Sequence, residues 1–302
     1  MRITKSMVYQ QVMKNLGRAT ERLSRDQLLI ATGRVIQKPS DDPVGTQVVL
    51  ALQSRIKEVD RYVSNIDNGV TQIDLTANAV GALTSNVGRM KEIAIQGSSD
   101  TASSDTTSIL AAEVDQILSA MLEAANTQIH GRYLFGGTNT QTKPYAATRD
   151  ATTDRITAVN ATGVVSGVVY REIATETKIQ INLPGDAIFA GSVPLFDLAI
   201  ELRDALVNTD NEAIRNTLDR FDEVTQLMSV TGTQLGARGE HLRSLRENLL
   251  DTRLQLIELK SDREDVDLTE AVAQLAQDEL QYQAALSAIT NIMRTSLIDF
   301  LT

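Results

Sequence analysis

The sequence predicts a mainly α-helical protein, an elongated rod of long antiparallel helices with paired terminal helices and a small inserted β domain. Two stretches carry this prediction, because seam positions, mostly apolar, recur in them at alternating spacings of three and four from Val49 to Ala94 and from Ile214 to Leu259. Such spacing lines one narrow stripe of an α-helix, which must be buried against another helix. Each stretch spans roughly 70 Å at 1.5 Å per residue, far longer than an average helix. We therefore expect two long helices packed on each other.

The composition favours a core of aliphatic side chains, since aromatic residues make up only 4% of the chain and Trp is absent. The formal charge of -10 disfavours a nucleic-acid backbone or an anionic bilayer as partner. The absence of Cys removes disulfides, thiolate metal sites and thiol nucleophiles. No stretch approaches membrane-spanning length, and the N-terminus lacks the apolar run of a cleaved signal peptide. We expect no membrane insertion and, if the protein is exported, no cleaved signal peptide.

The N-terminal segment predicts a weaker helix. A three-and-four pattern runs from Tyr9 to Ile30 and ends at Gly33, a residue type that commonly follows the last turn of a helix. Asp26 interrupts this pattern at a position that should face a partner. Because a short helix with such an interruption is marginal in isolation, we expect it to fold only against another helix.

A rigid joint is expected between this helix and the first long one. Pro39 disfavours helix at Lys38, and Asp42 followed by Pro43 is the combination of N-cap and first helical residue that starts a new helix. The carboxylates of Asp41 and Asp42 would lie at the positive end of that helix's dipole. A catalytic pair is the alternative interpretation, but no base, nucleophile or phosphate-binding loop accompanies these carboxylates.

The middle of the chain combines helices with a β insertion. A third helix is predicted from Leu110 to Gln128, where the three-and-four spacing returns. Residues 131–193 are rich in Thr, Val and Gly, and the strict alternation from Lys178 to Leu183 is typical of a strand that ends in a Pro-Gly turn. A further helix is expected from Pro194 to Val207.

The C-terminal end repeats the plan of the N-terminal end. An acidic stretch from Ser261 to Asp267 interrupts the second long pattern, and a last helix runs from Leu268 to Phe300. The chain therefore nests its elements, which places both termini at one end of a long molecule. This nesting predicts a terminal coiled-coil domain of residues 1–42 and 262–302, a helical rod domain of residues 43–130 and 194–261, and an inserted β domain of residues 131–193.

Polar side chains interrupt the apolar patterns at Asp26, Lys91, Arg238 and Glu279. One interpretation is ordinary imperfection in long patterns. The other is that these residues fix the register between neighbouring subunits, as buried polar residues can do in coiled coils.

No group of residues predicts a catalytic, cofactor-binding or metal site, so we expect a protein that is not an enzyme and binds no cofactor. His130 and His241 have no His or Cys near them in sequence, whereas transition-metal sites need several such ligands. The acidic run from Asp262 to Asp267 lacks the Gly and the closing Glu of an EF-hand loop. Capping carboxylates at a helix break are the favoured interpretation of that run.

Several motifs resemble those of a known family. The segments from Ala31 to Ile36 and from Pro39 to Pro43 are similar to the N-terminal signature of bacterial flagellins and flagellar hook-associated proteins, and the segment from Asp262 into the last helix is similar to their C-terminal signature. The block from Gly131 to Thr138 and the ending from Ser296 to Leu301 are most similar to the hook–filament junction proteins of that family. Flagellin, the filament subunit, is the alternative within it.

The resemblance implies a structural subunit that is exported unfolded through the flagellar type III pathway and assembles outside the cell, in the flagellum, as a ring. Its implied partners are copies of itself, hook-associated protein 1, flagellin and a flagellar export chaperone. The terminal helices would form an inner tube, and Asp41, Asp42 and Pro43 would join it to an outer layer. From the residues alone, a dimeric coiled-coil signalling protein whose insertion binds a small ligand competes with this interpretation. The residues expected at subunit or paired-helix interfaces are Tyr9, Leu16, Leu23, Ile30, Leu275, Tyr282, Leu286, Ile289 and Met293.

Overall fold

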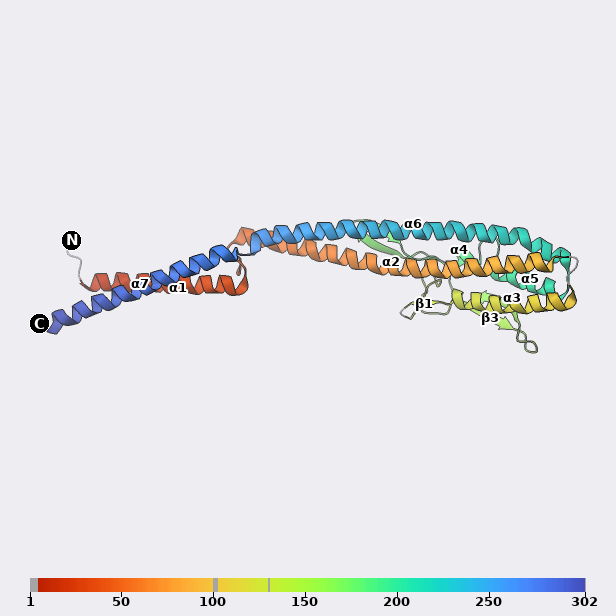
Figure 1. The fold of residues 1–302 in the computed structure, drawn as a ribbon, viewed down its shortest axis with the longest axis horizontal. Helices are drawn as coiled ribbons and strands as arrows, with labels where there is room; N and C mark the ends of the chain where they lie inside the picture. The colour runs from red at the N-terminus through yellow and green to blue at the C-terminus, as the bar shows by residue number, and fades with distance from the viewer. Residues whose placement is uncertain (1–4, 100–102, 130, 302) are drawn as a thin grey trace. The chain divides into compact units, whose positions relative to one another are not determined.

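Long helices dominate the computed structural model, which describes residues 5–99, 103–129 and 131–301 (Figure 1). Side chains are described only up to residue 290 in the last helix, and in the first helix at Met7 and from Gln10 onward. The mainly α fold with a small β region is the one predicted. No helix in the described part of the chain is both long and apolar enough to span a bilayer. The main helices are α1 (Lys5–Thr32), α2 (Pro43–Gly97), α3 (Ser104–Ala125), α5 (Leu195–Val207), α6 (Asn211–Glu264) and α7 (Leu268–Leu301).

The chain divides into two compact units. The terminal unit comprises Met1–Glu58 and Thr252–Thr302, and the central unit comprises Val59–Asp251. The long helices α2 and α6 contribute residues to both units.

In the central unit, α2 and α6 run antiparallel, as predicted (Figure 1). Lys91 forms an ion pair with Asp222, and Arg246 lies 2.6 Å from Asp67, so residue numbers rise along one helix while they fall along the other. Every position of the two predicted stripes that falls in this unit is buried or half-buried. The sustained spacing therefore identified the packed faces of both helices. The largest fully buried side chains on these faces include Ile66, Ile73 and Phe221.

The shorter helices α3 and α5 pack against each other in the central unit. Ser103 caps α3, since its hydroxyl accepts a hydrogen bond from the backbone N–H of Thr106 at 3.3 Å. Pro194 precedes α5 as its N-cap residue, which agrees with the predicted helix from Pro194 to Val207. The predicted third helix is also present, and its Leu110, Val114 and Met121 are buried in the core. It ends at Ala125, however, and Gln128, predicted as its last residue, belongs to a short strand, Gln128–Ile129.

The β insertion consists of three two-stranded antiparallel ladders. The alternation from Lys178 to Leu183 continues past the last strand, which ends at Gln180. The strand pairing ends early because the side-chain oxygen of Asn182, and not a backbone carbonyl, accepts the backbone N–H of Val169 at 2.7 Å. The ladders pair β1 (Gln128–Ile129) with β2 (Arg132–Tyr133), β3 (Tyr145–Arg149) with β4 (Ile156–Ala161), and β5 (Tyr170–Ala174) with β6 (Thr177–Gln180).

Four aromatic rings attach the insertion to the helices. Phe189, from the short helix α4 (Asp186–Phe189), lies 5.4 Å from Phe135, 4.9 Å from Tyr145 and 5.1 Å from Phe196, measured between ring centroids. Such edge and offset contacts add to the burial energy of the rings. Phe135 belongs to the Gly-Arg-Tyr-Leu-Phe-Gly-Gly block of the sequence, so one function of that block is to anchor the insertion.

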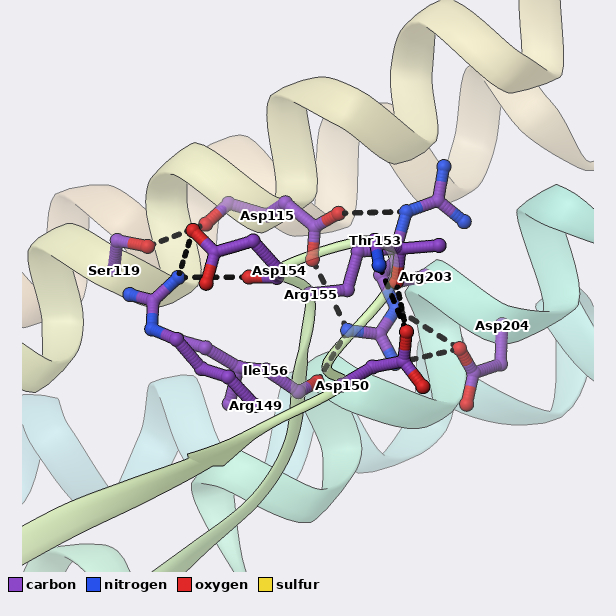
Figure 2. Close-up of polar contacts among 10 residues, drawn as sticks. All are labelled: Asp115, Ser119, Arg149, Asp150, Thr153, Asp154, Arg155, Ile156, Arg203 and Asp204. Atoms are coloured by element: carbon purple, nitrogen blue, oxygen red, sulfur yellow. Dashed lines mark hydrogen bonds and ion pairs between the residues drawn. The ribbon is translucent and has the colours of Figure 1, made fainter.

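A buried arginine fixes the β3–β4 hairpin to α3 and α5 (Figure 2). Arg203 of α5 is only 4% exposed and donates hydrogen bonds to Asp115 at 3.0 Å, to Asp204 at 2.7 Å and to the backbone carbonyl of Ile156. Burial by itself lowers the pKa of Arg203, but the hydrogen bonds to Asp204 and Asp115 outweigh burial and raise it. The guanidinium therefore stays charged, and each of its acceptors is held in place.

Candidate interaction site

The two family-like signatures meet in the terminal unit, where they connect the terminal helices to the long ones. Helix α1 ends before Gly33, which has a φ of +69° and donates its N–H to Leu29 at 2.8 Å, as expected for a C′ glycine. The N–H of Val35 then bonds the carbonyl of Glu264 at 2.7 Å, and the N–H of Val266 bonds the carbonyl of Gly33 at 3.0 Å. The connectors 33–35 and 264–266 thus pair in antiparallel fashion.

Charged side chains reinforce this pairing. The carboxylate of Glu264 is 8% exposed and lies 2.9 Å from Arg34 and 3.0 Å from Lys260, so two cations compensate one buried anion. Beyond it, Asp267 accepts the backbone N–H of Thr269 at 2.8 Å and caps the start of α7. The predicted role of the acidic run as a capped helix break is confirmed at Asp267.

The start of α2 has the predicted geometry. Asp42 accepts the backbone N–H of Val44 at 3.1 Å, and α2 begins at Pro43, so the N-cap and the first helical residue are those expected. Asp41 accepts the backbone N–H of Lys38 at 2.9 Å. Both carboxylates therefore bind backbone donors and hold the turn that precedes the helix.

Helices α1 and α7 pack side by side in antiparallel directions (Figure 1). Arg22 of α1 spans the contact, with its guanidinium 3.6 Å from Asp278 and 3.1 Å from the side-chain oxygen of Gln281. The side chains of Tyr9 and Met293 lie outside the described residues. Of the other residues expected at an interface, the structure places the following half-buried in this pair: Leu16, Leu23, Ile30, Leu275, Tyr282 and Ile289.

The face of α7 that packs on α1 differs from the predicted stripe. The stripe predicted from apolar spacing shares Leu275, Tyr282 and Ile289 with the packed face, but it also includes Glu279 and Leu286, which are exposed. A stripe drawn through the larger apolar side chains misses Ala271 and Ala285, whose small side chains lie on the packed face. The positions that face α1 in the described part of α7 are Ala271, Leu275, Asp278, Tyr282, Ala285 and Ile289.

Large apolar side chains consequently remain exposed on a second stripe of α7. Leu268 is 55% exposed, Val272 52% and Leu286 39%. The first two are four residues apart, and Leu286 follows Leu268 after five helical turns, so the three lie on nearly the same face. This stripe is the candidate interaction surface of α7.

A cavity of about 740 Å³ lies beside the connector in the terminal unit. Thr20, Ser24 and Leu28 of α1 line one side, and Val35 and Lys38 line the other. Because Leu28 and Val35 are both nearly half exposed, this cavity presents apolar surface with polar groups at its margin.

The remaining predicted positions are dispersed. Lys91 pairs with Asp222 across the long helices, Arg238 is half-buried, His241 is exposed on α6, and His130 lies outside the described residues. The sequence reasoning missed Asp278 as an interface residue, although its neighbour Glu279 stood in the predicted stripe. The packed face keeps Leu275, Tyr282 and Ile289 of the predicted stripe, but Asp278 takes the place of Glu279.

The comparisons with known proteins cover both halves of the chain. The model of the family described as the bacterial flagellin N-terminal helical region matches residues 3–140. Flagellar hook-associated protein 3 of Escherichia coli (strain K12) is 23% identical to this chain, and that of Salmonella typhimurium is 22% identical, each over 99% of both chains. A solved structure, described as a putative flagellar hook-associated protein from Vibrio parahaemolyticus, shares the fold with a TM-score of 0.65 at 18% identity. The match covers 74% of this chain and 100% of the chain in that structure.

Proposed function

We propose that this chain, a homologue of flagellar hook-associated protein 3 over its full length and hence a structural component of the bacterial flagellum, forms the junction between hook and filament. Its copies assemble as a ring, with hook-associated protein 1 on one side and flagellin on the other. The role is structural rather than catalytic.

The observation that carries the proposal is the small core of the terminal unit. Among its described side chains, the only apolar ones that are buried are Ala19, Val49 and Ala271. None is larger than Val, whereas Leu268 and Leu286 stay exposed. Burial of such small groups contributes little against the entropy of ordering two long helices. The terminal helices therefore need neighbouring subunits to complete their core.

The proposed interface lies on the terminal helices, and Asp41, Asp42 and Pro43 form the joint between an inner and an outer layer. The capped start of α2 supports this role, because it fixes the direction in which the chain leaves the joint. We retain the proposed domains, with residues 1–42 and 262–302 as the inner tube. The proposed contacts between subunits or paired helices are Tyr9, Leu16, Leu23, Ile30, Leu275, Tyr282, Leu286, Ile289 and Met293.

Export through the flagellar type III pathway, with the help of a chaperone, belongs to the same proposal. A terminal unit with few buried apolar groups is easily unfolded, which suits passage through a narrow channel before assembly outside the cell. Coupled folding and binding would then order the helices in the ring.

Immunogold labelling of flagella from the source bacterium tests the junction role. An antibody against the β insertion should label one narrow band where hook and filament meet. Label along the whole filament would favour the flagellin alternative, and label on the hook or on neither structure would contradict both roles. Hooks from cells that lack the gene serve as the control for antibody specificity, because they should carry no label.

A further inference from the structure

Two acidic side chains meet between α1 and α7. Asp26 of α1 and Asp278 of α7 both lie on the packed faces of these helices, and Arg22, one turn before Asp26, lies 3.6 Å from Asp278. Asp278 is only 3% exposed, and the Oδ2 atom of Asp26 is buried without a hydrogen-bond donor. Two ionised carboxylates that face each other across paired helices repel each other, and a buried acceptor without a donor adds a desolvation cost.

The neighbouring charges do not compensate both carboxylates. On α1, Arg22 lies 3.6 Å from Asp278, and its side chain is about half exposed, so water screens the pair. Arg25, also on α1, attracts Asp26 only through space. On α7, Glu279 next to Asp278 is exposed and adds no positive charge. The described cations thus compensate only one of the two negative charges. The second carboxyl group avoids an uncompensated charge only by carrying a proton.

We propose that Asp26 carries a proton in the α1–α7 contact, where it faces the buried Asp278, and that loss of this proton weakens the pairing of the terminal helices. The pair would make the terminal unit sensitive to pH. This inference concerns a single chain and does not depend on the junction role. In an assembling subunit, the pair would keep the isolated terminal helices loosely paired wherever the proton is lost.

The direction of the pH effect follows from linkage. Burial, the hydrogen bond to Asp278 and the negative charge of Asp278 raise the pKa of Asp26, and Arg25 and Arg22 oppose them only in part. A carboxyl group whose pKa is raised on folding binds its proton more tightly in the folded state. Its contribution to stability is therefore complete below the unfolded pKa of about 3.9 and is lost as the pH rises through the folded pKa.

Hydrogen exchange of the full-length protein measures the helix pairing directly. Peptides from α1 and α7 are followed by mass spectrometry between pH 4.5 and pH 8, and protection is corrected for intrinsic exchange. Protection of both helices should fall as the pH rises. The whole loss, counted from below the unfolded pKa of about 3.9, is about tenfold for each unit by which folding raises the pKa of Asp26, and the part above pH 4.5 is the part measured. Peptides from the central unit provide the internal reference.

Two variants separate the proton on Asp26 from other effects. Asp26→Asn supplies an N–H donor without a charge, so it should raise protection at pH 8 and remove the pH dependence. Glu279→Gln removes a neighbouring exposed carboxylate and should leave the pH dependence unchanged. The proposal is overturned if protection of the wild-type helices does not change with pH, if both variants behave alike, or if Asp26→Asn lowers protection at pH 8.

Discussion

Arg203 illustrates how a single residue organises the central unit. Its guanidinium is buried between α3, α5 and the β3–β4 hairpin, and its acceptors are Asp115 of α3, Asp204 of α5 and the backbone carbonyl of Ile156 in β4 (Figure 2). A buried ion pair is weak evidence for net stabilisation, but removal of one partner leaves an uncompensated charge. The cost of losing Arg203 should therefore exceed the value of the pair itself.

Arg203→Ala should destabilise the central unit by about 3 to 5 kcal/mol, because Asp115 then remains partly buried without its closest cation. Urea unfolding monitored by circular dichroism measures this change. Arg149→Ala is the matched control, since the pair of Arg149 with Asp154 at 3.5 Å is largely exposed and should contribute less than about 1 kcal/mol. Equal losses in the two variants would contradict the structural role assigned to Arg203.

At the scale of elements, the long helices could be predicted because a repeated spacing needs only local sequence. The register of α7 could not, because Ala271 and Ala285 face α1 for a reason that lies in the partner helix. The ladders of the insertion were also beyond prediction in detail. Asn182, for example, ends the regular pairing by donating hydrogen bonds to the distant carbonyls of Gly167 at 3.0 Å and Gly137 at 3.4 Å. Such contacts join segments that no local pattern relates.

In the candidate site, too, only the features that depend on local sequence could be predicted. The caps at Asp42 and Gly33 follow from residue types with strong local preferences, and the structure has both. The pairing of Arg34 with Glu264 and the contact of Asp26 with Asp278 join the two ends of the chain. A resemblance to known signatures placed these segments at the ends, but the contacts themselves depend on the fold.

Gly137 tests how tightly the insertion is built. Its φ is +57°, and a Cβ atom there would lie 2.2 Å from the backbone oxygen of Ser166. Gly137→Ala should therefore destabilise the central unit by roughly 1 to 3 kcal/mol, through a strained backbone and a displaced loop. Gly163→Ala is the control in the same insertion, because its nearest contact would be 3.5 Å and its φ is not positive. Thermal unfolding compares the two variants. A melting temperature for Gly137→Ala equal to that of Gly163→Ala would show that the loop is free to move.

At the scale of the whole molecule, the two units differ in how they bury apolar side chains. The central unit encloses large side chains such as Phe221, Ile73 and Met90 within one core. The terminal unit buries only small ones among its described residues and exposes Leu268, Val272 and Leu286. Stability of the central unit should consequently be a property of the single chain, whereas stability of the terminal unit should depend on assembly.

Leu286→Asp separates these two kinds of stability. Because Leu286 lies outside the face that contacts α1, the substitution should leave the helical content of the purified full-length protein and the melting of its central unit unchanged. In cells, a charge on the exposed stripe of α7 should prevent ring formation, so electron microscopy should show hooks without filaments. Ile109→Asp is the matched control, since Ile109 is 70% exposed on α3 of the central unit and its substitution should preserve filaments. Normal filaments on Leu286→Asp cells would mean that the exposed stripe of α7 does not contact neighbouring subunits, and the terminal helices would then have to complete their core through another face.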